Sequence, residues 1–214
     1  TLLSFNIMKD LINTALDAIS VSGLDYGDVR IVNRRAQDLS TRNAVVDGVD
    51  YSESLGIGIR VLFKGFWGFA ATNDLSLNSI KITAKKALEI AKASAFSRSG
   101  LPAVVPLSGT KAGLFKGSVR LYPLIPTRAV YMTPFKIDPF KVPLNQKIEY
   151  LLEADKTMLK VKGVTTCQSF MRAWREEKIF ASTEGSFIEQ TQTETGAGLE
   201  CMATDGKDAQ NRSY

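Results

Sequence analysis

Hydrophobic residues recur at helical spacing in three segments of the chain. The first segment starts at Met8 and stops before Gly23, the second covers residues 77–91, and the third covers residues 145–160. In each segment apolar side chains return every three or four residues, so a helix would carry them on one face. The pattern therefore predicts three amphipathic helices.

A period of two is clearest in residues 53–63, where apolar and small or polar positions alternate. Such alternation is typical of a half-buried strand. Lys64-Gly65 then forms a two-residue turn into residues 66–69, which predicts a hairpin. Gly56 and Gly58 leave one strand face nearly bare, which indicates that a helix or another backbone approaches there.

Further strand patterns surround this hairpin. Turn signals separate them at Asp47-Gly48, Arg175-Glu176 and Glu184-Gly185. One stretch, residues 189–195, has strand propensity but no apolar face, so we do not expect it to be buried within one subunit. The remaining predicted strands are 28–36, 39–47, 162–174, 177–182, 186–195 and 198–204.

All seven prolines lie between Pro102 and Pro143. Proline lacks an amide donor, so this region cannot form a regular helix or a central strand. Its many apolar residues argue against free disorder. We expect an extended arm packed against a body, with residues 97–127 mobile. The predicted fold class is α+β, with mixed or antiparallel sheets, about three flanking helices and a proline-rich extended arm.

These patterns predict a division of the chain into four parts. Residues 1–7 precede a plausible initiator, Met8, and are expected to be an extension or remnant. An α+β domain would cover 8–96, the arm 97–144, and a second α+β segment 145–214. We expect that second segment to be the start of a truncated carboxy-terminal domain, because the last residues complete no element.

Composition limits the class of protein. With 44% hydrophobic and 23% charged residues, the chain is typical of a globular protein. No apolar stretch reaches the ~20 residues that would cross a membrane, and no signal peptide is recognisable, so a cytoplasmic location is expected. The net charge of +5 is dispersed along the chain, which makes nucleic acid an unlikely partner. Cys167 and Cys201 are isolated and are expected to be reduced thiols.

The chain contains no histidine. This excludes a Ser-His-Asp triad, a Cys-His pair and a His-Glu-x-x-His zinc helix, so we assign no catalytic residue and no metal ligand. Gly56-Ile57-Gly58 lacks the third glycine and the following helix of a dinucleotide loop. Trp67, beside Arg60, could stack a base or a peptide side chain, but packing is the favoured interpretation.

Several motifs, in their order and spacing, resemble the TldD/PmbA family, also called modulator of DNA gyrase proteins. Together they span nearly the whole chain and correspond to the amino-terminal half of that family. The matching segments are Asp28-Val29-Arg30, residues 54–61, residues 65–72, Asp138-Pro139 with the following helix, residues 182–186 and residues 203–206.

The resemblance implies a peptidase that cleaves unfolded peptides inside a closed dimer. TldD-type subunits hold zinc with a His-Glu-x-x-x-His helix and a later cysteine in the carboxy-terminal half, so zinc is expected in that half and no cofactor in this fragment. PmbA-type subunits lack the motif and serve as partners, so a homodimer or a TldD-PmbA heterodimer is expected. Cys201 is not taken for the ligand cysteine.

We therefore expect an inactive fragment that shapes a substrate chamber and a dimer contact. An extended peptide would add to the polar strand through main-chain hydrogen bonds at Thr191, Thr193 and Glu194. The alternative is a non-enzymatic, PmbA-like regulatory partner. A direct DNA binder would rest on charge alone.

Overall fold

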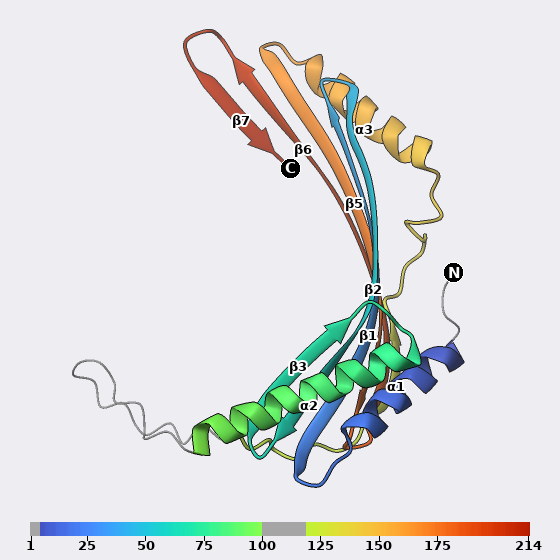
Figure 1. The fold of residues 1–214 in the computed structure, drawn as a ribbon. Helices are drawn as coiled ribbons and strands as arrows, with labels where there is room; N and C mark the ends of the chain where they lie inside the picture. Colours follow the sequence, from blue (N-terminus) through green and yellow to red (C-terminus); the bar gives the residue numbers. More distant parts are fainter. Residues whose placement is uncertain (1–4, 100–118) are drawn as a thin grey trace, which may run out of the picture. The chain divides into compact units, whose positions relative to one another are not determined.

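The computed structural model describes residues 5–99 and 119–214 (Figure 1). Three helices and seven strands follow one another along these residues. In chain order they are α1 (Phe5–Ile19), β1 (Leu24–Arg42), β2 (Val45–Phe63), β3 (Phe66–Thr72), α2 (Leu77–Ser99), β4 (Arg128–Met132), α3 (Leu144–Leu159), β5 (Val164–Ser182), β6 (Phe187–Thr204) and β7 (Ala209–Ser213).

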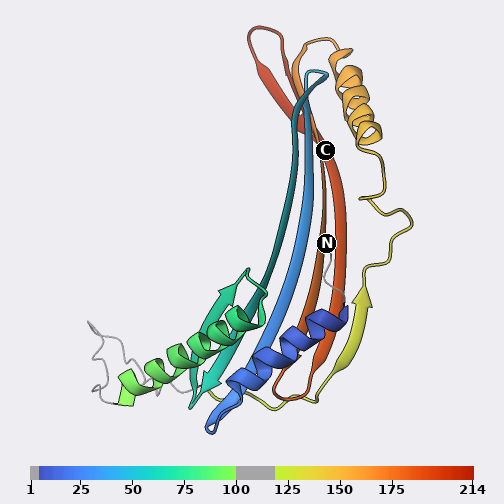
Figure 2. The same ribbon diagram turned by 45° about the vertical axis from the view of Figure 1, so that its right-hand side comes forward.

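All seven described strands join one sheet in the order β3-β2-β1-β5-β6-β4, and β7 pairs with β6. The sheet is mixed. β2 and β3 are antiparallel, as are β6 and β7. β4 instead runs parallel to β6, because Phe187 N–H bonds the Thr127 carbonyl and Thr133 N–H bonds the Thr191 carbonyl (Figure 2). The predicted α+β class is confirmed.

The chain divides into two compact units, each of which draws on several stretches of sequence. Unit 1 consists of Thr1–Val32, Leu55–Tyr131 and Lys178–Gln190. Unit 2 consists of Asn33–Ser54, Met132–Glu177 and Thr191–Tyr214. The predicted boundaries at residues 96 and 144 stay a prediction, and the expected mobility of residues 97–127 falls largely on residues outside the described ones.

The core of unit 1 lies between one face of its strands and the helices α1 and α2 (Figure 1). Alternate strand residues such as Val29, Ile57 and Ile59 are buried there against Ile12 and Ile80. The closest helix approach is at Gly68 of β3, where a Cβ would lie 2.1 Å from the Ala87 carbonyl oxygen and 2.5 Å from the Ala91 nitrogen. At Gly56 another backbone does approach, because a Cβ would lie 3.2 Å from the Thr72 carbonyl oxygen. Gly58 instead lies under the Phe69 ring, so the expected backbone approach is confirmed at Gly56 and wrong at Gly58.

In unit 2, α3 packs on the sheet through a partly polar interface. The fully buried Asp155 carboxylate accepts hydrogen bonds from Ser169 Oγ at 2.6 Å and from Ala44 N–H at 3.0 Å. Asn43 Oδ1 accepts the Cys167 N–H at 2.8 Å. The turn between β1 and β2 is therefore held by side chains that are distant in sequence.

Two predicted turns are wrong and two are confirmed. β2 runs through Asp47-Gly48, and β5 runs through Arg175-Glu176. The real β1–β2 turn is Asn43-Ala44, both with positive φ (51° and 60°). Lys64-Gly65 and Glu184-Gly185 do form hairpin turns, with φ of 80° at Gly65 and 93° at Gly185.

None of the helices in the described parts of the chain combines the length and the apolar character that a membrane span requires. Both cysteines are free thiols. α1 begins at Phe5, earlier than the predicted start at Met8.

Candidate functional site

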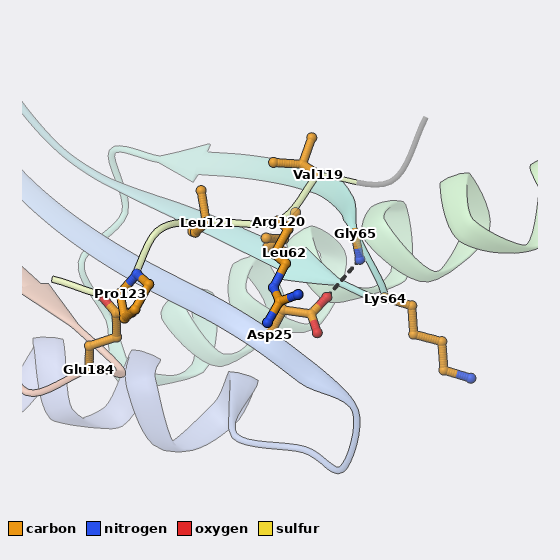
Figure 3. A pocket seen from close by; sticks show the side chains of 9 residues that line it. All are labelled: Asp25, Leu62, Lys64, Gly65, Val119, Arg120, Leu121, Pro123 and Glu184. Carbon is orange, nitrogen blue, oxygen red and sulfur yellow. Dashed lines mark hydrogen bonds between the residues drawn. The ribbon is translucent and has the colours of Figure 1, made fainter. Parts of the chain in front are cut away.

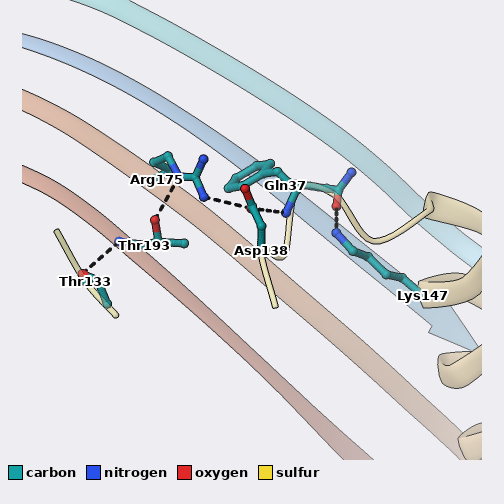
Figure 4. Close-up of polar contacts among 7 residues, drawn as sticks. Gln37, Thr133, Asp138, Lys147, Arg175 and Thr193 are labelled. Carbon is teal, nitrogen blue, oxygen red and sulfur yellow. Dashed lines mark hydrogen bonds and ion pairs between the residues drawn. The ribbon is translucent and has the colours of Figure 1, made fainter. Parts of the chain in front are cut away.

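The three predicted peptide-binding residues lie on β6 in unit 2. The Thr191 carbonyl accepts the N–H of Thr133 at 2.9 Å. Thr193 is buried, its N–H donates to Thr133 Oγ1 at 3.2 Å, and its Oγ1 accepts from Arg175 Nε at 2.9 Å (Figure 4). Glu194 is exposed. Residues after β4 therefore already occupy the outer edge of β6 at Thr191 and Thr193.

Arg175 is the centre of this arrangement, and the sequence interpretation placed it in a turn. Its Nη2 lies 2.8 Å from Asp138 Oδ1, and both side chains are largely buried, with 11% and 13% exposed (Figure 4). The guanidinium also lies over the rings of Phe135 and Phe140, at 5.6 and 5.4 Å. One side chain thus ties residues 133–140 to the sheet.

Asp138 is ionised in the folded protein, which strengthens its contact with Arg175. Burial alone would raise the pKa of Asp138, but the Phe140 N–H, at 2.9 Å, and the Arg175 guanidinium outweigh it and lower the pKa. The carboxylate is therefore charged at neutral pH and keeps a charge-assisted hydrogen bond to Arg175.

Beyond Thr193, β6 has an open stretch at residues 194–198. β5 pairs with one edge of β6, while β4 and β7 pair with it at either end of the stretch. Leu199 and Tyr214 exchange both backbone hydrogen bonds at 2.9 Å. In a strand, every second residue directs its N–H and C=O to the same edge. Counting back from Leu199, Ala197 and Thr195 therefore direct theirs to the edge of β6 that β7 occupies further along. Among the described strands none pairs with these two residues there, and both are exposed.

Unit 1 contains a separate pocket of about 400 Å³ beside the β2–β3 turn (Figure 3). The Asp25 carboxylate accepts the Gly65 N–H at 2.6 Å, and the Gly65 carbonyl accepts the Val119 N–H at 2.7 Å. Charges of both signs line it, from Asp25, Glu184, Lys64 and Arg120. Its described lining has no serine, threonine, cysteine or histidine, so the pocket offers no hydroxyl or thiol nucleophile and no imidazole base.

The residues present do not fit a zinc site. Protein zinc is bound mainly by histidine nitrogen and cysteine sulfur, and the sequence has no histidine. No three metal-binding side chains cluster within the part of the chain that the structure describes.

Two family models match successive parts of the chain. The family model described as PmbA/TldA metallopeptidase domain 1 matches residues 27–91, and that of the PmbA/TldA metallopeptidase central domain matches residues 137–214. Together they cover more than half of the chain, in the family's domain order. The protein is thus metallopeptidase-related by class, and the chain belongs to the PmbA/TldD family, as the resemblance indicated.

Two proteins with similar sequences are named metalloproteases. A metalloprotease of Methanocaldococcus jannaschii is 25% identical over 188 residues, which is 87% of this chain and 37% of that protein. A metalloprotease of Methanothermobacter thermautotrophicus is 25% identical over 193 residues, or 87% of this chain and 36% of the relative. The chain therefore spans little more than a third of the length of these relatives.

Solved structures share the fold. A protein from Bacteroides thetaiotaomicron described as a modulator of DNA gyrase aligns with a TM-score of 0.69 and 15% identity over 100% of this chain and 45% of its own. TldE from Thermococcus kodakarensis aligns with a TM-score of 0.53 and 14% identity, over 97% of this chain and 42% of its own. At such identities the likeness concerns the fold alone.

Proposed function

We propose that this chain is the amino-terminal, non-catalytic part of a TldD/PmbA-type zinc metallopeptidase subunit that degrades or processes unfolded peptides. The observation that carries the proposal is the ordered match of the first and central family domains, supported by relatives named metalloproteases. The zinc and its ligands belong to the carboxy-terminal half in such a protein. This part would shape the substrate chamber and the dimer contact.

The open stretch of β6 is the main-chain surface that suits an unfolded peptide. An extended peptide bonds to a strand edge through its backbone, largely regardless of its sequence. The predicted contact at Thr191, Thr193 and Glu194 is accordingly moved along β6 to Thr195 and Ala197, whose backbone groups face the edge. At about 3.3 Å per residue, the five residues 194–198 give space for a peptide strand of about five residues.

The full-length protein tests this proposal through peptide hydrolysis. With zinc bound, it is expected to cleave an unstructured peptide, and Ala197→Pro is expected to reduce the rate at least about tenfold by removing an edge N–H. Thr195→Val keeps the backbone and is the matched control. Because Ala197→Pro also risks misfolding, a peptide N-methylated at alternate residues provides a second test on the unaltered protein. Equal cleavage of the methylated and unmethylated peptides would contradict strand addition.

A non-enzymatic PmbA-like partner is the second candidate, because the matched family models cover PmbA-type as well as TldA-type proteins. The two candidates differ in what the full-length sequence contains. A His-Glu-x-x-x-His segment after residue 214 supports the peptidase, and its absence supports the partner. In the second case, peptide cleavage is expected only when a TldD-type subunit is added, and cleavage by the isolated protein would exclude the partner role.

A further inference from the structure

Two arginines share one buried carboxylate on the face of unit 1 that α1 and α2 leave uncovered. Asp28 alternates with the core residues Val29 and Ile31 and therefore points to the opposite face, where its side chain is 2% exposed. Arg60 approaches Asp28 Oδ2 with Nη2 at 2.6 Å and Nε at 2.8 Å. Arg30 Nε lies 3.5 Å from Oδ1.

Aromatic rings fix the planes of both guanidinium groups. Arg60 lies over the Trp67 ring at 4.7 Å, and Arg30 lies over the Phe180 ring at 5.4 Å. Phe69 is the register partner of Arg60 across β2 and β3, and it is 60% exposed. An arginine stacked on a ring keeps its N–H groups at the rim of the plane, where they can meet a planar acceptor.

Tyr26 adds no competing negative charge. It contacts the Trp67 ring edge-on at 6.1 Å between centroids. Burial, followed by the negative charge of Asp28 and a hydrogen bond to it, raises the pKa of Tyr26 to about 12. The phenol is therefore neutral at physiological pH, and the cluster of Asp28, Arg30 and Arg60 carries a net positive charge.

Arg60 is the closer partner of Asp28, and both of its contacts go to Oδ2. Arg60 alone gives Asp28 two charge-assisted hydrogen bonds, whereas the 3.5 Å contact of Arg30 is longer than an ordinary one. The two arginine side chains remain 41% and 47% exposed. Donor groups on both are thus directed to a face where solvent or a ligand can reach them.

The buried hydroxyl of Ser182 lies on the same face of the sheet as Asp28. Thr183 N–H bonds the Gly27 carbonyl at 2.9 Å, so Ser182 lies opposite Asp28 across the antiparallel β1–β5 pair. Ser182 Oγ is buried and has no hydrogen-bond partner among the described residues. Buried hydroxyls are nearly always bonded, so this unused group supports a polar ligand beside the arginine pair.

We propose that Arg30 and Arg60 form a carboxylate-binding site that takes an acidic group of an extended peptide, with an apolar neighbour of that group on Phe69. The two guanidinium edges suit the two oxygens of a planar carboxylate, and the net positive charge of the cluster selects an anion. That the ligand is a peptide rests on the proposed function, whereas the preference for a carboxylate rests on the arginine pair.

Calorimetric titration of the 214-residue chain with five-residue peptides, all acetylated at the amino end, tests the site. Three peptides are compared: one with a central glutamate and an amidated end, one with glutamine and an amidated end, and one with glutamine and a free terminal carboxylate. The expected result is at least about tenfold tighter binding of a carboxylate peptide than of the glutamine amide. Which of the two acidic peptides binds tighter tells a side-chain source from a terminal one. Equal affinity for all three overturns the proposal.

Variants assign the effect to the arginines. Arg30→Gln leaves the Arg60–Asp28 pair intact and is expected to abolish most of the carboxylate preference. Arg60→Lys keeps the charge but loses the planar guanidinium edge, so it is expected to weaken the preference too. Arg172→Gln removes an exposed, ion-paired arginine in unit 2 and is the matched control. Loss of the preference in the control, or its retention in Arg30→Gln, overturns the site. The titration needs neither zinc nor hydrolysis, so its failure is separate from that of the peptidase proposal.

Discussion

At the scale of single residues, Asp155 carries the turn between β1 and β2. Asp155→Ala would leave the Ala44 N–H and the Ser169 hydroxyl without their acceptor in a buried site. We expect a loss of roughly 2 to 4 kcal/mol in the free energy of unfolding, measured by urea denaturation. Glu153→Ala, on the exposed side of the same helix, removes only a surface ion pair, so its effect on the free energy of unfolding should be much smaller. Similar losses in both variants would contradict the assignment.

Lys147 is a second residue whose burial has a measurable consequence. Its side chain is 4% exposed, its Nζ donates to Gln37 Oε1 at 2.5 Å, and burial lowers its pKa despite the opposing charge of Asp138. Between the lowered folded pKa and the ordinary unfolded one, the unfolded chain binds more protons, so this residue makes stability rise with pH. Lys147→Met should therefore raise stability at pH 7 and flatten its rise toward pH 10, as followed by urea denaturation. An unchanged slope in Lys147→Met, or the same flattening in the exposed Lys156→Met, would refute this.

The sequence predicted residue roles well where they depend on neighbours in the chain and poorly where they depend on distant ones. Gly65 and Gly185 were found because a positive φ favours glycine locally. Asn43-Ala44 was missed because its turn is held by Cys167 and Asp155, far along the sequence. Arg175 was placed in a turn because nothing nearby in sequence reveals its partners Asp138 and Thr193.

Among the contacts between elements, the one between α2 and β3 depends on Gly68 having no side chain. A Cβ on Gly68 would lie within 2.5 Å of backbone atoms of Ala87 and Ala91, which cannot move without shifting the helix. Gly68→Ala should therefore destabilise the protein by about 2 to 4 kcal/mol, measured as a lower midpoint of urea unfolding.

Gly196 provides the matched control for Gly68, because nothing lies within 4 Å of a Cβ at that position. Gly196→Ala should change stability by less than about 1 kcal/mol, with any change tending to stabilise, since alanine restricts the unfolded chain. Equal effects at the two glycines would show that close packing is not the reason for Gly68.

The elements themselves were largely predictable. Three helices and the β2–β3 hairpin follow from periodicity, because one face of each is buried in a core. The strands were predicted too short, since β1, β2, β5 and β6 run through polar positions such as Asp47 and Arg175 that resemble turns. β4 was not predicted, because prolines surround it and its five residues are all exposed.

At the scale of the whole molecule, the order of motifs predicted the family better than any single residue predicted the site. The segments 54–61 and 182–186 lie within the parts of the chain that the first and the central family domain match, in that order. The predicted peptide contact at Thr191, Thr193 and Glu194 stays a prediction. The sequence alone could not show that Thr133 bonds to Thr191 and Thr193 at this edge of β6.

The 214-residue chain is expected to bind zinc weakly by itself. Its two cysteines are the strongest available zinc ligands, but burial, followed by the charge of Asp155, raises the pKa of the Cys167 thiol and disfavours the thiolate that a metal needs. With no histidine to complete a tetrahedral site, the chain after dialysis should retain well under about one zinc per chain by elemental analysis. It should also cleave no unstructured peptide. The full-length protein, assayed in parallel, should retain zinc and cleave the peptide. Stoichiometric zinc with turnover in the 214-residue chain would place the catalytic centre within these residues and overturn the proposed function.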